Sequence, residues 1–379
     1  MPKVIDLFAG AGGLSLGAAR AGFEISAAVE LDSNAILTHA KNFPGTIHIQ
    51  EDIEYLTSDR LLKLSKIMPG DIFGIIGGPP CQGFSNIGLR QHDDNRNQLF
   101  LKFFNMVNEI QPVFFLAENV PGIMDKRYDS IRHSAFALMK GYQLLPPIHV
   151  NASEYGAPTT RTRVFFVGYR KVSKTKRLCV NDILFQKVPL SYRTNVLQAF
   201  EGLPQKIQYS KTSSGARKLR EDYTNSQIQH SQSDFFYNRV LRKRPVDVGS
   251  PSYLKDFDKE FWVNGFLPTK HSEDVKKRYG KLKFGQQDTV SKSVRLDPSG
   301  YCPTLRAGTG PDRGSYQAVR PIHFKYSRVI NPREAARLQG FPDWFELPDT
   351  IWHSFRQIGN SVSPIVAERI LTAIYQNLT

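Results

Sequence analysis

The chain is short of cysteine, and this shortage excludes two kinds of protein. Its 379 residues include 3 cysteines, Cys81, Cys179 and Cys302. Their unrelated spacings exclude a disulfide framework, which needs an even set of cysteines, and a zinc knuckle, which needs close pairs. The 9 histidines are also scattered without the spacing of metal ligands, so we expect no bound metal.

Long apolar runs are missing as well. No segment approaches the roughly 18–20 apolar residues that cross a bilayer. The first residues contain no basic stretch followed by an apolar core, unlike an export signal. We therefore expect a cytoplasmic protein without a membrane partner. With 40% hydrophobic residues, the chain can form one large domain or two ordinary ones.

Negative charge is in deficit, since 35 acidic residues face 50 lysines and arginines and the formal net charge is +15. A solvated basic surface explains such an excess without a partner. Here, however, the basic clusters at 171–177, 217–220, 239–244 and 276–283 are interleaved with aromatic residues. Basic groups neutralise phosphates and aromatic rings stack on bases, so the middle of the chain is typical of a nucleic-acid-binding surface.

Residues 1–170 alternate between short apolar runs and helical patterns. This alternation predicts an α/β fold with a doubly wound, mainly parallel sheet. The strands are expected at 4–8, 25–31, 46–50, 73–77, 113–118, 143–151 and 163–169. The helices are expected at 14–21, from 33 to about 43, at 99–110 and at 130–140.

The pattern changes at about residue 172. From there to about 327, Gly, Pro, Ser, Asn and charged residues dominate. This stretch is too long for a loop in a compact domain and predicts a second, smaller and irregular domain. A short helix with proline in its first turn is expected at 332–338, and an amphipathic helix at 363–378 that returns to the first sheet. The predicted domains are 1–188, 189–330 and 331–379.

A glycine-rich turn follows the first predicted strand. Glycines at 10, 12 and 13 allow a ligand to approach the backbone, but Ser15 replaces the third glycine of a dinucleotide-binding fingerprint. Glu30 closes the second strand, where it can hydrogen-bond ribose hydroxyls, and Asp52 follows the third strand. Two carboxylates and no phosphate-binding signature suit S-adenosylmethionine. A solvated strand end is an equally good interpretation of Glu30 by itself.

Two reactive groups are predicted at the same sheet edge. The apolar run 73–78 stops at Pro79-Pro80, which places Cys81 on a loop at the carboxyl end of a strand. A thiol there is a candidate nucleophile, although it could be a small apolar residue of a turn. Glu118 ends the next buried strand, where a carboxyl group must be paired or protonated. Alone, it would suggest a structural ion pair.

Arg161 and Arg163 lie two residues apart on an extended segment, so their side chains are expected on the same side. They would face an anionic or carbonyl-bearing ligand. Without other motifs beside them, two such arginines are more often ordinary surface charges.

In this order, the motifs resemble the cytosine-C5 DNA methyltransferase family of bacterial restriction–modification systems. The resemblance covers nearly the whole chain outside the variable middle. One position departs from the family pattern, since Thr159 stands where the family usually has glutamine. The matching segments are 6–17, Glu30, Asp52, Gly78-Pro79-Pro80-Cys81-Gln82-Gly83-Phe84-Ser85, Glu118-Asn119-Val120, Arg161-x-Arg163, 333–342 and 357–362.

The resemblance implies a Rossmann-like, S-adenosylmethionine-dependent catalytic domain at 1–188, a target-recognition domain at 189–330 and a C-terminal segment at 331–379. It implies that Cys81 adds to C6 of a flipped cytosine and that Glu118 supplies an acid at N3. It also implies that Arg163 contacts O2 of the base, while Arg161 supports the loop.

The same resemblance implies a donor site and a closing loop. The loop 83–98 would close over the flipped base, with Gln82, Ser85 and Arg96 as DNA contacts. The substrate would be double-stranded DNA, and the enzyme a monomer. It would protect host DNA from a cognate restriction endonuclease encoded nearby, without direct contact between the two. The donor would be held by Phe8, Gly10, Gly12, Glu30, Leu31, Asp52, Ile53, Pro80, Leu99, Asn360, Ser361 and Val362.

Three other functions stay open from the residues. A tRNA cytosine-C5 methyltransferase shares all the catalytic segments, although the long basic middle favours DNA. A nicotinamide-dependent oxidoreductase would share the strand–turn–helix start but lacks a hydride-transfer site. A catalytically inactive DNA-binding protein is disfavoured because Cys81 and Glu118 are both present.

Overall fold

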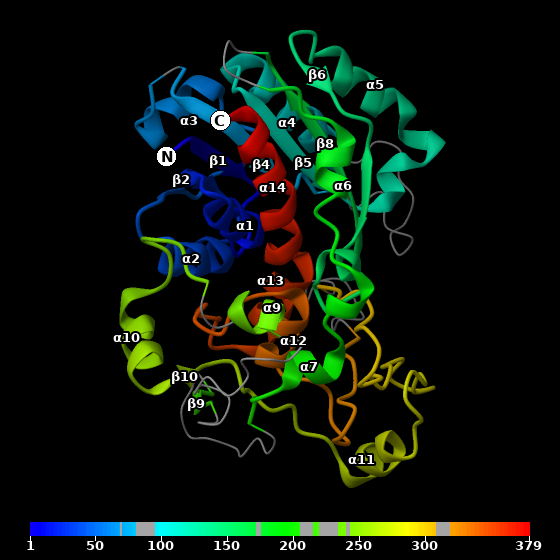
Figure 1. Cartoon of the computed structure of the whole chain (residues 1–379). Coiled ribbons are helices and arrows are strands. Elements are labelled where there is room, and N and C mark those ends of the chain that lie inside the picture. The colour runs from blue at the N-terminus through cyan, green and yellow to red at the C-terminus, as the bar shows by residue number, and fades with distance from the viewer. Residues whose placement is uncertain are drawn as a thin grey trace. The chain divides into compact units, whose positions relative to one another are not determined.

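The computed structural model describes residues 1–68, 70–80, 95–171, 176–204, 215–219, 234–239, 243–307 and 319–379. These residues form two compact units. The first unit comprises Met1–Asn151, Thr162–Lys187 and Val366–Thr379, and the second comprises Ala152–Arg161 and Val188–Ile365. The predicted domain boundaries remain a prediction, whereas the irregular character of the middle is visible in the short elements of the second unit (Figure 1).

An eight-stranded sheet forms the centre of the first unit, in the order β3-β2-β1-β4-β5-β8-β6, with β7 paired to β8. The pairs β3–β2, β2–β1, β1–β4 and β4–β5 are parallel, and β5–β8 is antiparallel. The predicted doubly wound, mainly parallel sheet is confirmed. The strands are β1 Lys3–Leu7, β2 Glu24–Val29, β3 Ile47–Ile49, β4 Ile72–Gly77, β5 Phe114–Asn119, β6 Gln143–Leu144, β7 Ile148–Asn151 and β8 Thr162–Tyr169.

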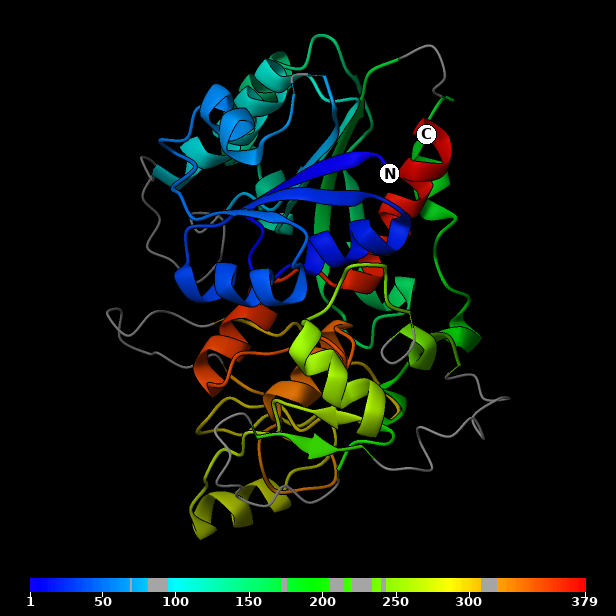
Figure 2. The same ribbon diagram turned by 90° about the vertical axis from the view of Figure 1, so that its left-hand side faces the viewer.

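Helices cover both faces of this sheet. Figure 2 shows α1 (Gly13–Ala21) and α2 (Ser33–Asn42) on one face, and α3 (Ser58–Ser65), α4 (Asn95–Ile110) and α5 (Asp129–Ala137) on the other. The α3–α5 face contains an apolar core that includes Phe100, Phe104 and Phe115. The helix α14 (Pro364–Leu378) contacts α1 and the turn that follows it, where the rings of Phe23 and Tyr375 meet edge-on 5.2 Å apart.

Two sequence predictions need correction in this unit. The single strand expected at 143–151 is split into β6 and β7, because Pro146 and Pro147 lack the amide hydrogens that a continuous ladder needs. The helix expected at 130–140 ends at Ala137. In addition, α3 was missed; Thr57 begins it by accepting a hydrogen bond from the backbone N–H of Arg60.

The second unit consists of short helices and one small antiparallel sheet. The predicted helix at 332–338 is confirmed as α12 (Pro332–Gln339), begun by a reciprocal hydrogen-bond pair between Asn331 and Glu334. The helix α13 (Ile351–Asn360) was not predicted. The described residues of the unit also form two 3₁₀ helices, Ala152–Tyr155 and Leu190–Tyr192, together with α7 Val196–Phe200, α9 Asp234–Tyr237, α10 Pro251–Glu260, α11 Glu273–Gly280, β9 Arg217–Lys218 and β10 Trp262–Val263.

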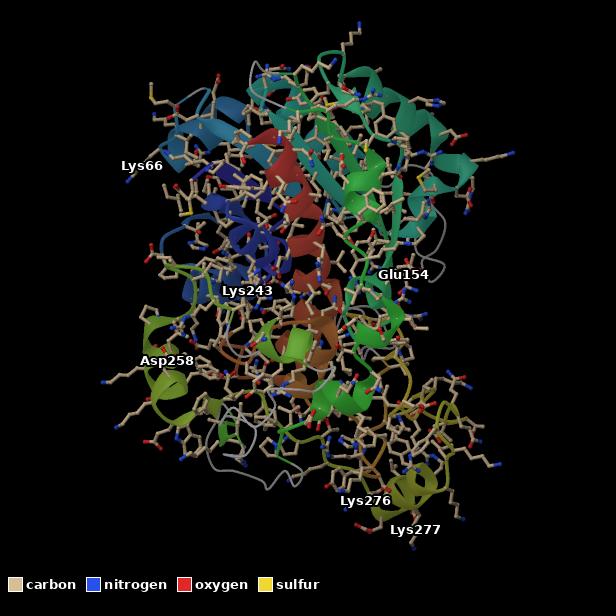
Figure 3. The ribbon with its side chains drawn as sticks, in the orientation of Figure 1. Lys66, Glu154, Lys243, Asp258, Lys276 and Lys277 are labelled. Atoms are coloured by element: carbon tan, nitrogen blue, oxygen red, sulfur yellow. The ribbon has the colours of Figure 1, made fainter. Side chains whose placement is uncertain are left out.

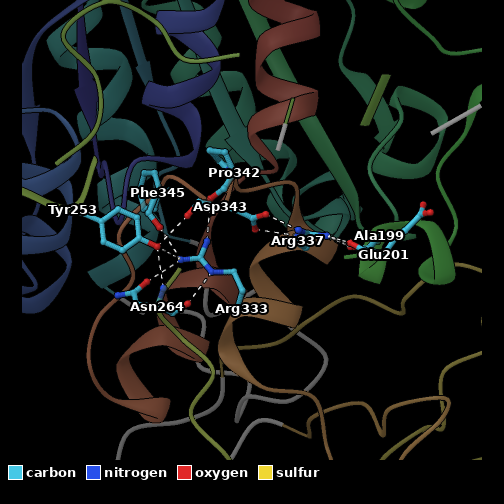
Figure 4. A network of polar contacts seen from close by, with 9 residues as sticks. All are labelled: Ala199, Glu201, Tyr253, Asn264, Arg333, Arg337, Pro342, Asp343 and Phe345. Atoms are coloured by element: carbon cyan, nitrogen blue, oxygen red, sulfur yellow. Dashed lines mark hydrogen bonds and ion pairs between the residues drawn. The ribbon is translucent and has the colours of Figure 1, made fainter. Parts of the chain in front are cut away.

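Two buried arginines of α12 organise this unit (Figure 4). Arg333 donates to the backbone carbonyls of Asn264, Pro342 and Phe345 and to the side-chain oxygen of Asn264. Arg337 forms a two-pronged ion pair with Asp343 and also donates to the carbonyls of Ala199 and Glu201. Hydrogen bonds from these two side chains therefore connect loops that are far apart in the sequence.

Candidate active site

The glycine turn after β1 is a left-handed segment that leads into α1. Gly10 and Gly12 have φ angles of 56° and 97°. A Cβ atom at Gly12 would lie 2.4 Å from Cε2 of Phe43 on the α2 side, so this glycine is required for packing. A Cβ atom at Gly10 would meet nothing within 4 Å among the described residues. The turn thus leaves the backbone at Gly10 accessible to a ligand.

Glu30 fastens this turn to the loop after β2. Its Oε2 accepts the backbone N–H of Gly10 at 2.9 Å, and its Oε1 accepts that of Asp32 at 2.8 Å. Burial raises the pKa of the Glu30 carboxyl. The next residue, Leu31, is 59% exposed. Glu30 therefore has a structural role that the sequence did not reveal, and each oxygen keeps a lone pair for a further donor.

The predicted donor-binding residues of the first unit lie along one sheet edge. Phe8, Glu30, Asp52 and Pro80 follow the carboxyl ends of β1, β2, β3 and β4, which are neighbours in the sheet. Ile53 is buried in the core, and Leu99 of α4 packs against that core. Asn360, Ser361 and Val362 belong to the second unit, at the end of α13. There the side chain of Gln339 donates to the carbonyl of Ser361 at 2.6 Å.

Glu118 of β5 and Arg163 of β8 form an ion pair farther along the same sheet. Arg163 Nε lies 2.8 Å from Glu118 Oε1, and the two side chains are only 15% and 11% exposed. Glu118 is the penultimate residue of β5, beside the strand β4 that leads toward position 81. The ion pair that the sequence suggested for an isolated Glu118 is present, and its partner is the predicted base-contacting arginine.

The segment before position 81 touches the end of β5. A Cβ atom at Gly78 would lie 3.2 Å from Glu118 Oε2, so the carboxylate lies against this backbone. The side chain of Asn119 donates to the carbonyl of Pro79 at 3.4 Å. Sequence reasoning gave Asn119 no role, although it follows Glu118 directly. Cys81, Gln82 and Ser85 lie outside the described residues, and so does the side chain of Arg96 in α4.

Arg161 differs from Arg163 in its surroundings. It is 3% exposed, and its guanidinium donates to the backbone carbonyls of Leu305 and Asn360 in the second unit. Thr159 forms a similar link, since its hydroxyl donates to the carbonyl of Cys302 at 3.0 Å. The threonine that departs from the family pattern therefore supplies a side-chain contact to the backbone at 302.

The helix α11 of the second unit carries three basic side chains beside the acidic Glu273 and Asp274. Figure 3 labels Lys276 and Lys277 on this exposed helix. Lys276 pairs with Glu273, and Arg278 pairs with the buried Asp288. In the described part of the chain, no helix is long and apolar enough to span a membrane. Within the same residues, no cluster of histidine, cysteine or acidic side chains has the arrangement of a metal site.

Comparisons with known proteins find similar proteins over nearly the whole chain. The chain is similar to the type II methyltransferase M.XorII of Xanthomonas oryzae pv. oryzae, with 37% identity over 97% of this chain and 83% of the relative. It is also similar to M.DdeI of Desulfomicrobium norvegicum, with 32% identity over 98% and 88%. A crystal structure from E. coli, described as a candidate DNA modification methyltransferase encoded within a prophage, has a TM-score of 0.86 and 47% identity and covers 100% and 99% of the two chains.

More distant structures share the fold alone. The Dnmt2 methyltransferase of S. pombe has a TM-score of 0.61 at 17% identity and covers 99% of both chains. The family of C-5 cytosine-specific DNA methylases, whose members depend on S-adenosylmethionine, matches residues 2–376. This match favours the DNA enzyme over the tRNA methyltransferase and the oxidoreductase. The chain belongs to the C-5 cytosine-specific DNA methylase family and is a DNA (cytosine-5-)-methyltransferase.

Proposed function

We propose that this methyltransferase acts on a cytosine flipped out of double-stranded DNA, through a covalent bond between Cys81 and C6 of the base. One observation carries the proposal: the Glu118–Arg163 ion pair lies against the backbone that leads to Cys81. A carboxyl group and a guanidinium so close together can bind the polar edge of a pyrimidine. Extrusion is needed because the target atoms are stacked inside the duplex.

In this mechanism the residues divide the work. The Cys81 thiolate forms a bond to C6, and the electron pair of the C5–C6 double bond makes C5 nucleophilic. Glu118, which is ion-paired in the free enzyme, takes up a proton when the base binds and shares it with N3, where electron density develops, while Arg163 donates hydrogen bonds to O2. After C5 has been methylated, loss of its proton restores the double bond as the C6–S bond breaks. The thiolate of Cys81 is then free again.

The residues at the sheet edge fit S-adenosylmethionine as the methyl donor. The open backbone at Gly10 admits a close ligand, and the carboxylates of Glu30 and Asp52 can accept hydrogen bonds from hydroxyl and amino groups. When bound, the donor supplies a methyl group on a positively charged sulfur. The residues proposed to hold it are Phe8, Gly10, Gly12, Glu30, Leu31, Asp52, Ile53, Pro80 and Leu99, with Asn360, Ser361 and Val362.

The proposed substrate is duplex DNA, bound by a monomer. The chain's charge of +15 supports a polyanionic partner, and α11 presents the exposed Lys276 and Lys277. Gln82, Ser85 and Arg96 would act on the DNA side of the flipped base, and Arg161 would support the loop through its carbonyl contacts. Because M.XorII and M.DdeI are type II methyltransferases, we assign this enzyme to protection of host DNA against a cognate restriction endonuclease.

Transfer of a labelled methyl group tests the reaction. The chain should label duplex DNA and leave tRNA unlabelled. Cys81→Ser should abolish transfer, whereas Cys179→Ser should leave it unchanged, because Cys179 is an exposed thiol in the first unit. Labelling of tRNA, or full activity of Cys81→Ser, would contradict the proposal. Sequencing of methylated cytosines in cells that express the chain then gives the target site.

A further inference from the structure

A hydrogen-bonded chain of four side chains runs beneath the glycine turn of the first unit. Ser15 Oγ donates to Asp6 Oδ2 at 2.6 Å. The ring of His39 contacts Ser15 Oγ through Nε2 at 3.1 Å and His48 Nε2 through Nδ1 at 2.9 Å. The chain therefore connects β1 to β3 through α1 and α2. None of these side chains has a role in the proposed reaction.

The inner end of this chain is an unusually placed carboxyl group. Asp6 is fully buried between Ala28 of β2 and Ile76 of β4. Among the described residues, no hydrogen-bond donor reaches its Oδ1 atom. Burial, with a smaller contribution from the charge of Glu30, raises the pKa of Asp6 to about 7 against the hydrogen bonds from Ser15. Asp6 can thus change its charge near neutral pH.

The two histidines are neutral over the same range. Burial lowers the pKa of His39 well below its ordinary value, and His48 adds to this effect. Burial also lowers the pKa of the half-buried His48. A neutral imidazole has one N–H donor and one acceptor nitrogen, so the two contacts of His39 must run in one direction along the chain.

This requirement allows two complete arrangements. With Asp6 ionised, Ser15 donates to Asp6, His39 Nε2–H donates to Ser15, and His48 Nε2–H donates to His39 Nδ1. With Asp6 protonated, Asp6 donates to Ser15, Ser15 donates to His39 Nε2, and His39 Nδ1–H donates to His48. One proton taken up at His48 Nδ1 and shifted along each bond converts the first arrangement into the second. All three hydrogen bonds are kept in both.

The other charged side chains near these four hydrogen-bonded residues lie on the elements that pack around them. Among the described residues, Glu30 is the charged side chain that contributes to the pKa shift of Asp6. Arg20 of α1 lies 3.9 Å from Glu368 of α14. In the described elements that pack here, the charged side chains are Lys3 on β1, Glu24 on β2, Glu30 and Asp32 after β2, Arg20 on α1, Lys41 on α2, and Glu368 and Arg369 on α14.

We propose that Ser15, His39 and His48 are positioning residues that control the proton on Asp6, and that the Asp6 carboxylate is a counter-charge for the cationic methyl donor. This inference rests on the proposed donor site at the glycine turn. An ionised Asp6 attracts the sulfonium, so donor affinity is high above pH 7 and falls as the pH decreases and Asp6 takes up a proton. The neutral product S-adenosylhomocysteine gains nothing from this charge.

The first test compares these two ligands by calorimetry between pH 5.5 and 8.5. Both carry the same amino-acid group, but the sulfonium lowers the pKa of the donor's amino group, so the effect of Asp6 is read as the difference between the unaltered enzyme and Asp6→Asn. The affinity for S-adenosylmethionine divided by that for S-adenosylhomocysteine should be roughly fivefold lower at pH 5.5 than at pH 8.5. In Asp6→Asn the ratio should lose this change, and only the titration of the ligands' own amino groups should remain. A constant ratio in the unaltered enzyme overturns the inference, whereas no donor binding at any pH contradicts the proposed function instead.

The second test needs no donor. Histidine labelled with ¹⁵N reports which ring nitrogen carries the proton. His39 should change from the Nε2–H to the Nδ1–H form as the pH falls through about 7. Ser15→Ala should abolish this change. Ser26→Ala is the control and should not, because the buried Ser26 donates a hydrogen bond to Glu24 and is not part of the hydrogen-bonded series from Asp6 to His48. If Ser15→Ala does not fold, His48→Val at the partly exposed end provides the same interruption. A pH-independent tautomer of His39 in the unaltered enzyme overturns the inference.

Discussion

Replacing Asp343 with asparagine will strongly destabilise the second unit, because it leaves the Arg337 guanidinium buried without its carboxylate. Both side chains of this pair are 0% exposed, and Arg337 Nε and Nη2 lie 3.0 and 2.5 Å from the two carboxylate oxygens. An asparagine retains one oxygen acceptor and directs an amide N–H₂ toward a cation. Removing one partner of a buried pair costs about 3–5 kcal/mol of unfolding free energy.

The chain contains a matched control for this variant. Arg244 and Asp258 also form a two-pronged pair in the second unit, at 2.9 and 3.0 Å. Their side chains are 32% and 53% exposed, and Figure 3 labels Asp258 on α10. Asp258→Asn should therefore cost less than about 1 kcal/mol. Because both pairs have the same two-pronged geometry, the difference in unfolding free energy between the two variants measures the effect of burial.

Tryptophan fluorescence during urea unfolding is the suitable assay. All 3 tryptophans, Trp262, Trp344 and Trp352, belong to the second unit, so the signal follows that unit. The Asp343→Asn transition should move to much lower urea, whereas Asp258→Asn should stay near the unaltered protein. Equal midpoints for the two variants would refute the conclusion that the buried pair holds α12 to its neighbours.

The remaining predictions concern catalysis, pH and the glycine turn. Glu118→Gln should lower the rate of methyl transfer by about 10²–10⁴-fold, because the amide cannot supply the proton at N3, while binding of duplex DNA in a filter or anisotropy assay stays near normal. Burial lowers the pKa of His323 to about 4, so the folded state binds fewer protons than the unfolded state between pH 6.5 and 4. The unfolding free energy of the second unit should fall by up to about 3 kcal/mol across this window, and less in His323→Gln; equal slopes in both proteins would refute this assignment. Gly12→Ala should weaken donor binding and destabilise the fold, because the new methyl group would overlap Phe43, whereas Gly10→Ala, which meets open space, should suffer only the backbone strain of roughly 1–2 kcal/mol. Equal stability of the two alanine variants in thermal unfolding would contradict the packing role of Gly12.

The sheet of the first unit was predictable because its strands are continuous apolar runs that end in turns. Asp52 and Pro80 could be placed at one edge from their positions after such runs alone. The Asp6 chain was not predicted, since a carboxyl group inside a strand gives no signal of which histidines fold over it. Similarly, nothing local in the sequence indicates that Arg333 will satisfy carbonyls at 264 and 345.

The second unit resisted prediction for a related physical reason. Its elements are too short to show a clear helical or strand period, and its stability depends on hydrogen bonds between residues far apart in the chain. Arg337, for example, donates to a carbonyl at position 199. The helix α13 was missed although it begins with Thr350, which accepts a hydrogen bond from the backbone N–H of His353.

The most direct measurement is covalent trapping on a duplex that carries 5-fluorocytosine at the mapped target site. Fluorine at C5 cannot leave as a proton does, so the enzyme stays attached to the base once the methyl group has been transferred. With S-adenosylmethionine present, we predict a denaturant-resistant protein–DNA adduct whose modified peptide, analysed by mass spectrometry, carries the base on Cys81. An adduct on a different side chain, or none with an enzyme that methylates ordinary cytosine, would contradict the assignment of Cys81 as the nucleophile.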